Sequence, residues 1–323
     1  GSVAVAFVTT LKLSSHWLPP KRYAFATGML LVAGMTGAVF AGYPLHQATI
    51  LFGWRNVTLA SALLALLMAV LVFMFVRDDP SEKGLKSYLD KESSGQKEEK
   101  ILKSLGRVFR FSNTWFLTIA PGGIVGAVLT FSGLWGVPFL TEVYHLENAT
   151  AATLCSLVML AWALSGPIYS LVSERIQLRR MPYLIGTMIS LISWSLEFLI
   201  PEWSLRVLSL LLFLAGFFSG GMILGFAQGK ETLPLSLSGT VSGVINMGVL
   251  TGPMLLQPLV GFLLDSTKPT AHTSMEIAVG FSFEDYRFAF LPVLIWLVLS
   301  VLALYLSQES YCKNKIFNET NSG

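Results

Sequence analysis

Charged residues are scarce in this chain, and their scarcity excludes an ordinary water-soluble protein. Only 13% of the 323 residues are Asp, Glu, Lys or Arg, whereas a soluble domain contains about 25%. Hydrophobic residues make up 53% of the chain, so too little polar surface remains to cover a particle of this size. We therefore predict an integral membrane protein.

Cysteine and histidine are also rare. Cys155 falls in an apolar stretch and Cys312 in the polar C-terminal tail, so no disulfide framework is implied. The four histidines lie near the ends of apolar stretches or in loops, and none pairs with an acid at helical spacing. Intramembrane enzymes place such sets, or metal ligands, within their spans. We expect no metal, no cofactor and no enzymatic activity.

The hydrophobic residues are gathered into blocks of roughly 18 to 28 residues, the length that crosses a bilayer. The blocks do not alternate with a period of two, so a β-barrel is not predicted. Backbone amides must be satisfied within each span, which makes each block a helix. We expect an all-α protein with about nine transmembrane helices, at residues 1–17, 23–52, 54–76, 112–141, 149–172, 182–201, 205–229, 239–264 and 286–307.

We expect no signal peptide at the start of this sequence. Gly1 opens directly into apolar sequence, without a charged region or a cleavage pattern of small residues. We expect the chain to begin within a membrane segment whose natural N-terminus is missing.

A polar, lysine-rich stretch at residues 77–110 separates the third and fourth blocks and predicts an exposed linker. Its last part predicts an amphipathic helix at the membrane interface. The residues expected to face lipid are Ile101, Leu102, Leu105, Val108 and Phe109.

Basic residues are distributed unevenly between the loops. If the loop at Lys21 is cytoplasmic, alternation places 17 of the 22 Lys and Arg residues on that side. This bias predicts a cytoplasmic linker and a cytoplasmic C-terminus. The short loops and tail favour a bacterial inner membrane.

The glycine pattern indicates an internal repeat. Gly28 and Gly37 are nine residues apart, and so are Gly243 and Gly252, 215 residues later. Each pair follows a proline-containing loop. Two related halves around a charged linker are typical of secondary transporters. The alternative is chance, because glycine is common in membrane helices.

Four stretches resemble the major facilitator superfamily, in the order that the family has them. HWLPPKRYAFATG resembles its fifth helix and the preceding loop, GWRNVTLASALL with VRDDP its sixth, and SGTVSGVINMG with LLQPLVGFLLD its eleventh. GPIYSLVSERIQLRR resembles the second-half copy of the loop motif G-x-x-x-D-R-x-G-R-R, with Glu174 in place of Asp and no glycine after Arg175.

This resemblance implies a helical bundle of two pseudo-symmetric halves. Residues 1–76 would form the rest of an N-terminal bundle (family helices four to six) and residues 77–110 the linker. Residues 111–307 would form a six-helix C-terminal bundle (helices seven to twelve) and residues 308–323 a cytoplasmic tail.

The charged loop after the fifth block has two interpretations. The resemblance implies a gate latch that holds the halves together, formed by Glu174, Arg175, Arg179 and Arg180. The alternative is that its arginines only set the topology.

Lys12 is an ionisable residue within a predicted span, which marks a functional hypothesis. The family's fourth helix lines the central cavity, so Lys12 would contact a carboxylate- or phosphate-bearing substrate. The alternative is a lysine whose amine reaches the interface.

Other polar residues within the spans predict a substrate cavity. Ser242, Asn246, Pro253 and Gln257 share one helical stripe, which either lines a cavity or hydrogen-bonds a neighbouring helix. Gln228 raises the same question. Further candidates are Thr130 on the segment resembling the family's mobile seventh helix, Trp135, which is otherwise an interfacial tryptophan, and Trp162, which otherwise packs.

The carboxylates within the spans do not indicate a proton carrier. We expect Glu197 to pair with Arg206 near the outer surface, and Glu142 to lie near that surface too. A proton-carrying acid would then lie outside this chain.

The sequence thus predicts a secondary active transporter for a small polar or anionic metabolite. Its partners would be that solute, protons and lipid, without nucleic acid, and we expect a monomer. Ala41 and Gly42 stand where related drug/proton antiporters have Gly and Pro, which favours uptake. The alternatives are an efflux antiporter and, from another class, a membrane-embedded enzyme or receptor.

Overall fold

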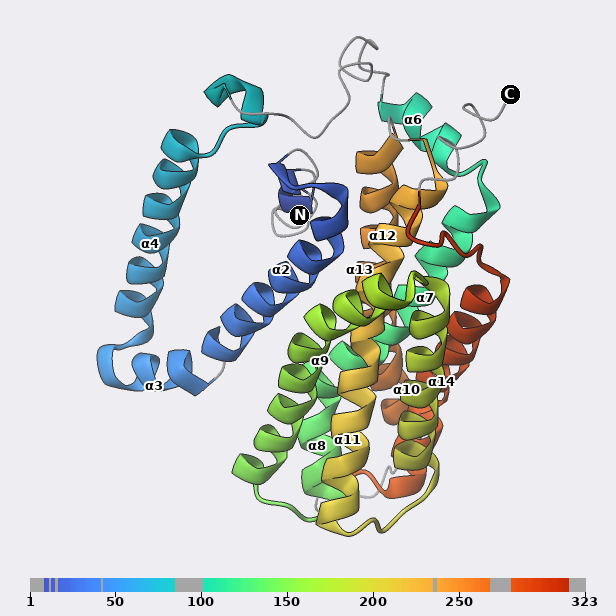
Figure 1. The fold of residues 1–323 in the computed structure, drawn as a ribbon. Helices are drawn as coiled ribbons and strands as arrows, with labels where there is room; N and C mark the ends of the chain where they lie inside the picture. The colour runs from blue at the N-terminus through green and yellow to red at the C-terminus, as the bar shows by residue number, and fades with distance from the viewer. Residues whose placement is uncertain are drawn as a thin grey trace.

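The computed structural model describes residues 9–11, 13, 14, 17–41, 43–84, 101–234, 237–267 and 280–313, and this part of the chain contains helices and no strands (Figure 1). The helices are α2 (Pro20–Ala41), α3 (Tyr43–Phe52), α4 (Trp54–Phe75), η1 (Pro80–Lys83), α6 (Ile101–Val108), α7 (Ser112–Thr130), η2 (Phe131–Trp135), α8 (Gly136–Glu142), α9 (Asn148–Ile176), α10 (Arg180–Leu199), α11 (Leu205–Ser219), η3 (Gly220–Met222), α12 (Ile223–Thr232), α13 (Ser238–Thr267) and α14 (Phe283–Leu306).

Seven helical stretches among the described residues are long and apolar enough to cross a membrane, and they confirm the all-α membrane fold. They are Trp54–Phe75, Ser112–Glu142, Asn148–Ile176, Arg180–Leu199, Leu205–Thr232, Ser238–Thr267 and Phe283–Leu306. The expected count of nine is not confirmed. Most of residues 1–17 lie outside the described part, and the expected segment 23–52 is divided between α2 and α3.

Helices α7 to α14 pack into one bundle, with α7 against α13 and α14, and α9 and α10 both against α11 (Figure 1). An aromatic cluster fills one side of its core. Phe198 stacks on Phe290 with ring centroids 4.1 Å apart, and Phe131 reaches the same cluster. Such rings bury large apolar areas, and they join α7, α10 and α14.

Small residues bring α7 and α13 into backbone contact. A Cβ atom added to Gly126 would lie 3.2 Å from Gly252 Cα, and one added to Gly252 would overlap the carbonyl oxygen of Gly122. Glycines without side chains thus permit this close approach of the two helices. Beyond this contact, residues Phe131–Trp135 form a π-helical turn between α7 and α8.

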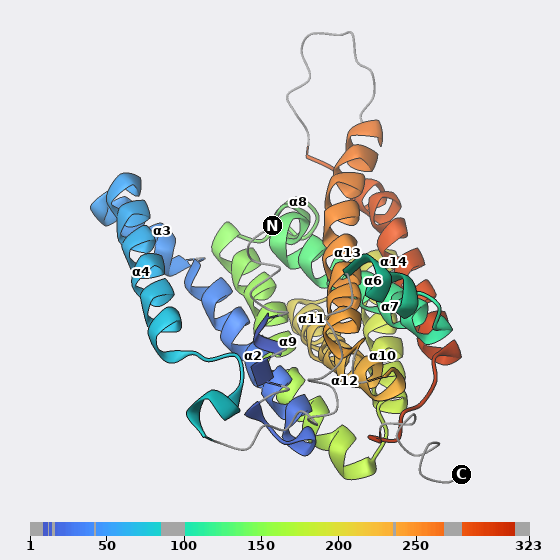
Figure 2. The same cartoon turned by 90° about the horizontal axis from the view of Figure 1, so that it is seen from above.

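The N-terminal helices meet the bundle through α2, which packs along α9. A Cβ atom added to Gly28 would lie 2.8 Å from Pro167 N and 3.0 Å from Gly166 C, so the two backbones touch. By contrast, α4 stands apart from the bundle in both ribbon views, and none of its residues is buried (Figures 1 and 2).

The amphipathic helix expected at the end of the linker is present as α6, but its environment differs from the prediction. Val108 is buried in the protein core, and Leu105 and Phe109 are partly buried against that core. α6 also contacts α13. For Leu105, Val108 and Phe109 the expectation that they face lipid is wrong, because the protein itself covers them. The side chains of Ile101 and Leu102 lie outside the described part of the structure.

Each spanning stretch of the bundle runs between two ends. One end is formed by α6, residues 177–179, the end of α12 and residues 307–313. We call it the basic end. The opposite end contains residues 143–147, 200–204 and 280–282.

Candidate functional site

Arg179 forms the centre of a buried polar cluster at the basic end. It precedes the first residue of α10, and only 3% of its surface is exposed. Its Nη2 lies 2.9 Å from Glu231 Oε1, and its Nε donates to both oxygens of that carboxylate at 3.2 and 3.3 Å. Its Nη1 donates to Ser173 Oγ at 3.0 Å. Such a forked contact fixes the carboxylate in both position and angle.

The electrostatics of this ion pair favour the charged arginine. Burial alone would lower the pKa of Arg179, but the hydrogen bonds to Glu231 and its negative charge raise that pKa above the ordinary value. Arg179 therefore keeps its positive charge throughout the physiological pH range.

The C-terminal tail binds to the same cluster. The Glu309 carboxylate accepts hydrogen bonds from the backbone nitrogens of Arg179 at 2.7 Å, Arg180 at 3.0 Å and Met181 at 3.3 Å. An anion is stabilised there by the unpaired amides and dipole of a helix N-terminus. Ser310 Oγ donates to Glu231 Oε2 at 2.5 Å, so the tail contacts both partners of the ion pair.

A second set of hydrogen bonds joins the tail to α7 and α12. Asn113 Oδ1 accepts from the Gln308 nitrogen at 2.9 Å, and Asn113 Nδ2 donates to Thr232 Oγ1 at 2.9 Å. Gln228, a predicted cavity residue, donates its amide to Gln308 O at 2.6 Å and to Ser307 Oγ at 3.2 Å. Its amide nitrogen is thereby engaged by the tail.

The four residues of the predicted latch have different environments. Arg179 is the one that forms an ion pair within the described residues. Arg175 is exposed, and the Arg180 guanidinium lies 5.6 Å from the centre of the Tyr305 ring. Glu174 Oε1 is buried without a hydrogen-bond partner in the described part of the chain. A gating role for these residues stays a prediction.

The acidic partners of the cluster were not identified from the sequence. Glu231 lies 52 residues after Arg179, and Glu309 lies in the tail. The available signal was position, because each acid closely follows a spanning block at the side predicted to carry the basic loops. All the contacts described above lie within residues 113–310.

Trp135 and Gln257 join the π-helical turn to α13. Gln257 Nε2 donates to Leu129 O at 3.0 Å, and Trp135 Nε1 donates to Gln257 O at 3.0 Å. The polar stripe on α13 was expected either to line a cavity or to hydrogen-bond a neighbouring helix. Gln257 makes such a bond between helices. A cavity role for either residue stays a prediction.

We predict that Trp135→Phe lowers stability by about 1 kcal/mol, since it removes one hydrogen bond and keeps the ring. The check is thermal unfolding of the purified protein in detergent. Trp115→Phe is the matched control, because Trp115 Nε1 also donates to a backbone oxygen, Phe109 O at 3.0 Å, but at an exposed position. If the two changes lowered stability equally, the hydrogen bond from Trp135 to Gln257 would have no special importance for stability.

The remaining cavity candidates are buried near the middle of the bundle helices. Thr130 Oγ1 and Trp162 Nε1 have no hydrogen-bond partner among the described residues. Asn246 on α13 is also buried. Lys12 lies outside the described residues. Buried polar atoms are normally paired, so these two donors are candidates for contact with a polar ligand.

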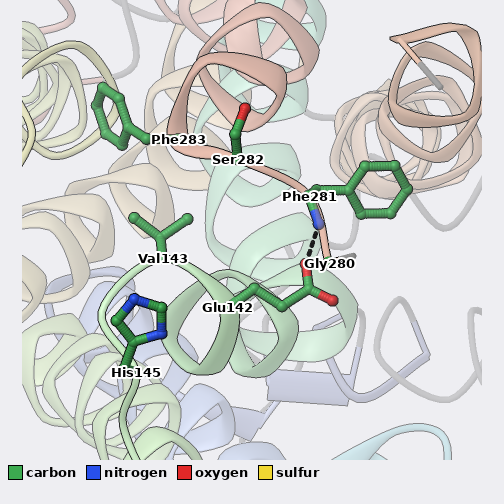
Figure 3. Close-up of a pocket in the computed structure, with 7 residues that line it drawn as sticks. All are labelled: Glu142, Val143, His145, Gly280, Phe281, Ser282 and Phe283. Atoms are coloured by element: carbon green, nitrogen blue, oxygen red, sulfur yellow. Dashed lines mark hydrogen bonds between the residues drawn. The ribbon is translucent and has the colours of Figure 1, made fainter. Parts of the chain in front are cut away.

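A shallow pocket of about 520 Å³ lies at the opposite end, lined by Glu142, Val143, His145 and residues 280–283 (Figure 3). Glu142 Oε2 accepts from the Phe281 nitrogen at 3.1 Å and from the Tyr286 hydroxyl at 2.8 Å. These bonds make Glu142 an anchor between α8 and the start of α14. The described residues contain no group of His, Cys, Asp and Glu that would hold a metal ion.

Comparison with known proteins defines the class to which this bundle belongs. The described helices form a polytopic membrane bundle, and the family model for the Major Facilitator Superfamily matches residues 1–257. This chain belongs to the Major Facilitator Superfamily, and it is a membrane transporter. A relative from Thermus thermophilus, a probable nitrate/nitrite antiporter (NarK1), is 24% identical over 347 residues, which cover 97% of this chain and 72% of the relative. The resemblance inferred from the four sequence motifs is confirmed.

Proposed function

We propose that this transporter moves a small polar or anionic solute by alternating access, with protons as the coupling ion and uptake as the direction. The observation that supports the proposal is a pair of buried donors, Thr130 Oγ1 and Trp162 Nε1, that have no partner among the described residues. Thr130 directly precedes the π-helical turn of residues 131–135, and α9, which carries Trp162, contacts that turn. An indole N–H can only donate, so it suits a solute that offers oxygen acceptors.

The rest of the proposed machinery follows the predicted division of the chain. Residues 1–76 and 111–307 form the two halves, which rock against each other at the α2–α9 contact, and Arg179 with its neighbours gates the basic end. We propose that this end faces the cytoplasm of a bacterium, because basic loops stay on that side. Lys12 adds a positive charge to the solute site, and the protein works as a monomer.

Reconstitution in proteoliposomes tests the function. Nitrate and nitrite are the first solutes to try, since the relative is named for them, followed by organic acids, amino acids and sugar phosphates. We expect an imposed proton gradient, acidic outside, to drive accumulation of one anionic or polar solute. Extrusion of the solute by the same gradient would support the efflux antiporter instead. Lack of any transport would contradict the proposal.

We predict that Trp162→Phe weakens solute binding by about tenfold or more, because a hydrogen bond to a charged group contributes about 1.5–3 kcal/mol. The measurement is the concentration dependence of uptake for the solute found in the screen. Trp203→Phe is the control, since Trp203 Nε1 donates to Leu196 O at the opposite end of the bundle. An unchanged KM in Trp162→Phe would remove this residue from the solute site.

A further inference from the structure

Glu197, near the end of α10, is a buried acid that the machinery described above does not use. Only 1% of its surface is exposed, and neither carboxylate oxygen has a hydrogen-bond partner in the part of the chain that the structure describes. The expected pairing with Arg206 is wrong. Arg206 is exposed at the start of α11, and no ion pair to Glu197 forms among the described residues.

The surroundings of Glu197 are aromatic. Trp194 and Phe198 occupy the same buried face of α10, and their rings stack 5.2 Å apart. Trp194 also packs 5.1 Å from Phe131, the first residue of the π-helical turn. Glu197 therefore lies in a cluster that contacts the break in α7 directly.

Among the described residues, the titratable and charged groups at the Glu197 end of α10 form no ion pair with its carboxylate. Tyr144, between α8 and α9, interacts with Glu197 electrostatically, and a phenol is neutral. On α14, the Tyr286 hydroxyl binds Glu142, and Arg287 pairs with Glu284 at 2.6 Å. Asp285, also on α14, accepts a hydrogen bond from the Ser282 hydroxyl. Further charged or titratable groups described at this end are His145, Glu147, Glu202 and Arg206, and all four are exposed.

An unpaired carboxylate in such a place is far less stable than the neutral acid, because no donor or cation among the described residues replaces its hydration. Glu197 is therefore a carboxylic acid in this conformation. Losing its proton requires that a donor or water reach the buried face of α10, where Trp194 packs against Phe131 of the π-helical turn.

We propose that Glu197 is the site that binds and releases the proton exchanged in the transport cycle. This inference rests on the proposed proton coupling, and it assigns that coupling to a residue. The ligand is a proton, and the group that rearranges with it is the cluster of Trp194, Phe198 and Phe131.

Infrared spectroscopy of the purified protein in lipid tests the protonation directly, without a solute. The wild type should show the carbonyl band of a protonated carboxylic acid at neutral pH, and Glu197→Gln should remove it. Glu202→Gln, at an exposed position near the same end, should leave the band unchanged. A band that persists in Glu197→Gln, or that is absent from the wild type, would overturn the proposal.

Transport with nitrate as the probe tests the coupling. Glu197→Gln should keep nitrate exchange between equal concentrations. Its accumulation of nitrate driven by a proton gradient should be at least about tenfold lower than that of the wild type, because the variant cannot exchange a proton. Accumulation equal to that of the wild type would overturn the assignment. If the wild type moves no nitrate, the proposed solute fails, and the infrared result still decides whether Glu197 holds the proton.

Discussion

Gly28→Ala is expected to reduce transport by tenfold or more while the bundle formed by α7 to α14 stays folded. The added methyl carbon would lie 2.8 Å from Pro167 N and 3.0 Å from Gly166 C, closer than real Cβ contacts allow. Both obstacles are backbone atoms of α9, so no side chain can rotate away. Overpacking of this kind costs about 1–3 kcal/mol, which is enough to displace α2 from α9 and to shift their packing equilibrium by about tenfold or more.

Gly37→Ala is the matched control for this change. Gly37 lies on the same helix and a Cβ atom added to it meets nothing within 4 Å. It should transport like the wild type and be slightly more stable, because alanine favours a helix over glycine by about 1 kcal/mol. The measurement is solute uptake beside thermal unfolding. Equal activity of the two variants would show that the α2–α9 contact does not control transport.

Arg179→Ala should lower stability by about 3 kcal/mol, because it leaves the largely buried Glu231 carboxylate without its cation. The change also removes the donor to Ser173 Oγ and weakens the arrangement that the tail binds. Thermal unfolding of the protein in detergent measures the loss. Arg175→Ala, at an exposed position in the last turn of α9 before the same loop, should change stability by less than about 0.5 kcal/mol.

A double-mutant cycle separates the ion pair from the other contacts of Arg179. Arg179→Ala combined with Glu231→Ala should cost less than the sum of the single changes, with a coupling of about 1–3 kcal/mol. Additive losses would mean that the two side chains stabilise the protein independently. A loss in Arg175→Ala as large as that in Arg179→Ala would assign the effect to the net charge of the loop.

The helices of this protein were predictable because the bilayer imposes a length on them. The expected block at 149–172 lies within α9, and that at 182–201 differs from α10 by two residues at each end. The expected block at 112–141 matches the combined range of α7, η2 and α8. Its internal π-helical turn was not foreseen, since such a turn depends on what packs against the helix and not on the apolar pattern.

The candidate site was predictable in part. Arg179 was identified as a charged residue in a special loop, but its partner Glu231 is brought to it by the packing of α9, α10 and α12. Glu197 was recognised as an acid within a span. Its expected partner was taken from nearby sequence, and the structure instead surrounds it with aromatic residues from three helices. Contacts between residues that lie far apart in the sequence can be identified only from the tertiary structure.

The touching main chains of α7 and α13 have a mechanical consequence. Where Gly122 and Gly252 meet, no layer of side chains exists that would let one helix slide or turn against the other. We therefore expect the two helices to move together as one rigid unit during the transport cycle. The segment from Phe131 to Trp135 is the first place beyond this contact where the two helices can bend relative to each other, and Phe131 packs there on Trp194, on the buried face of α10 that also carries Glu197.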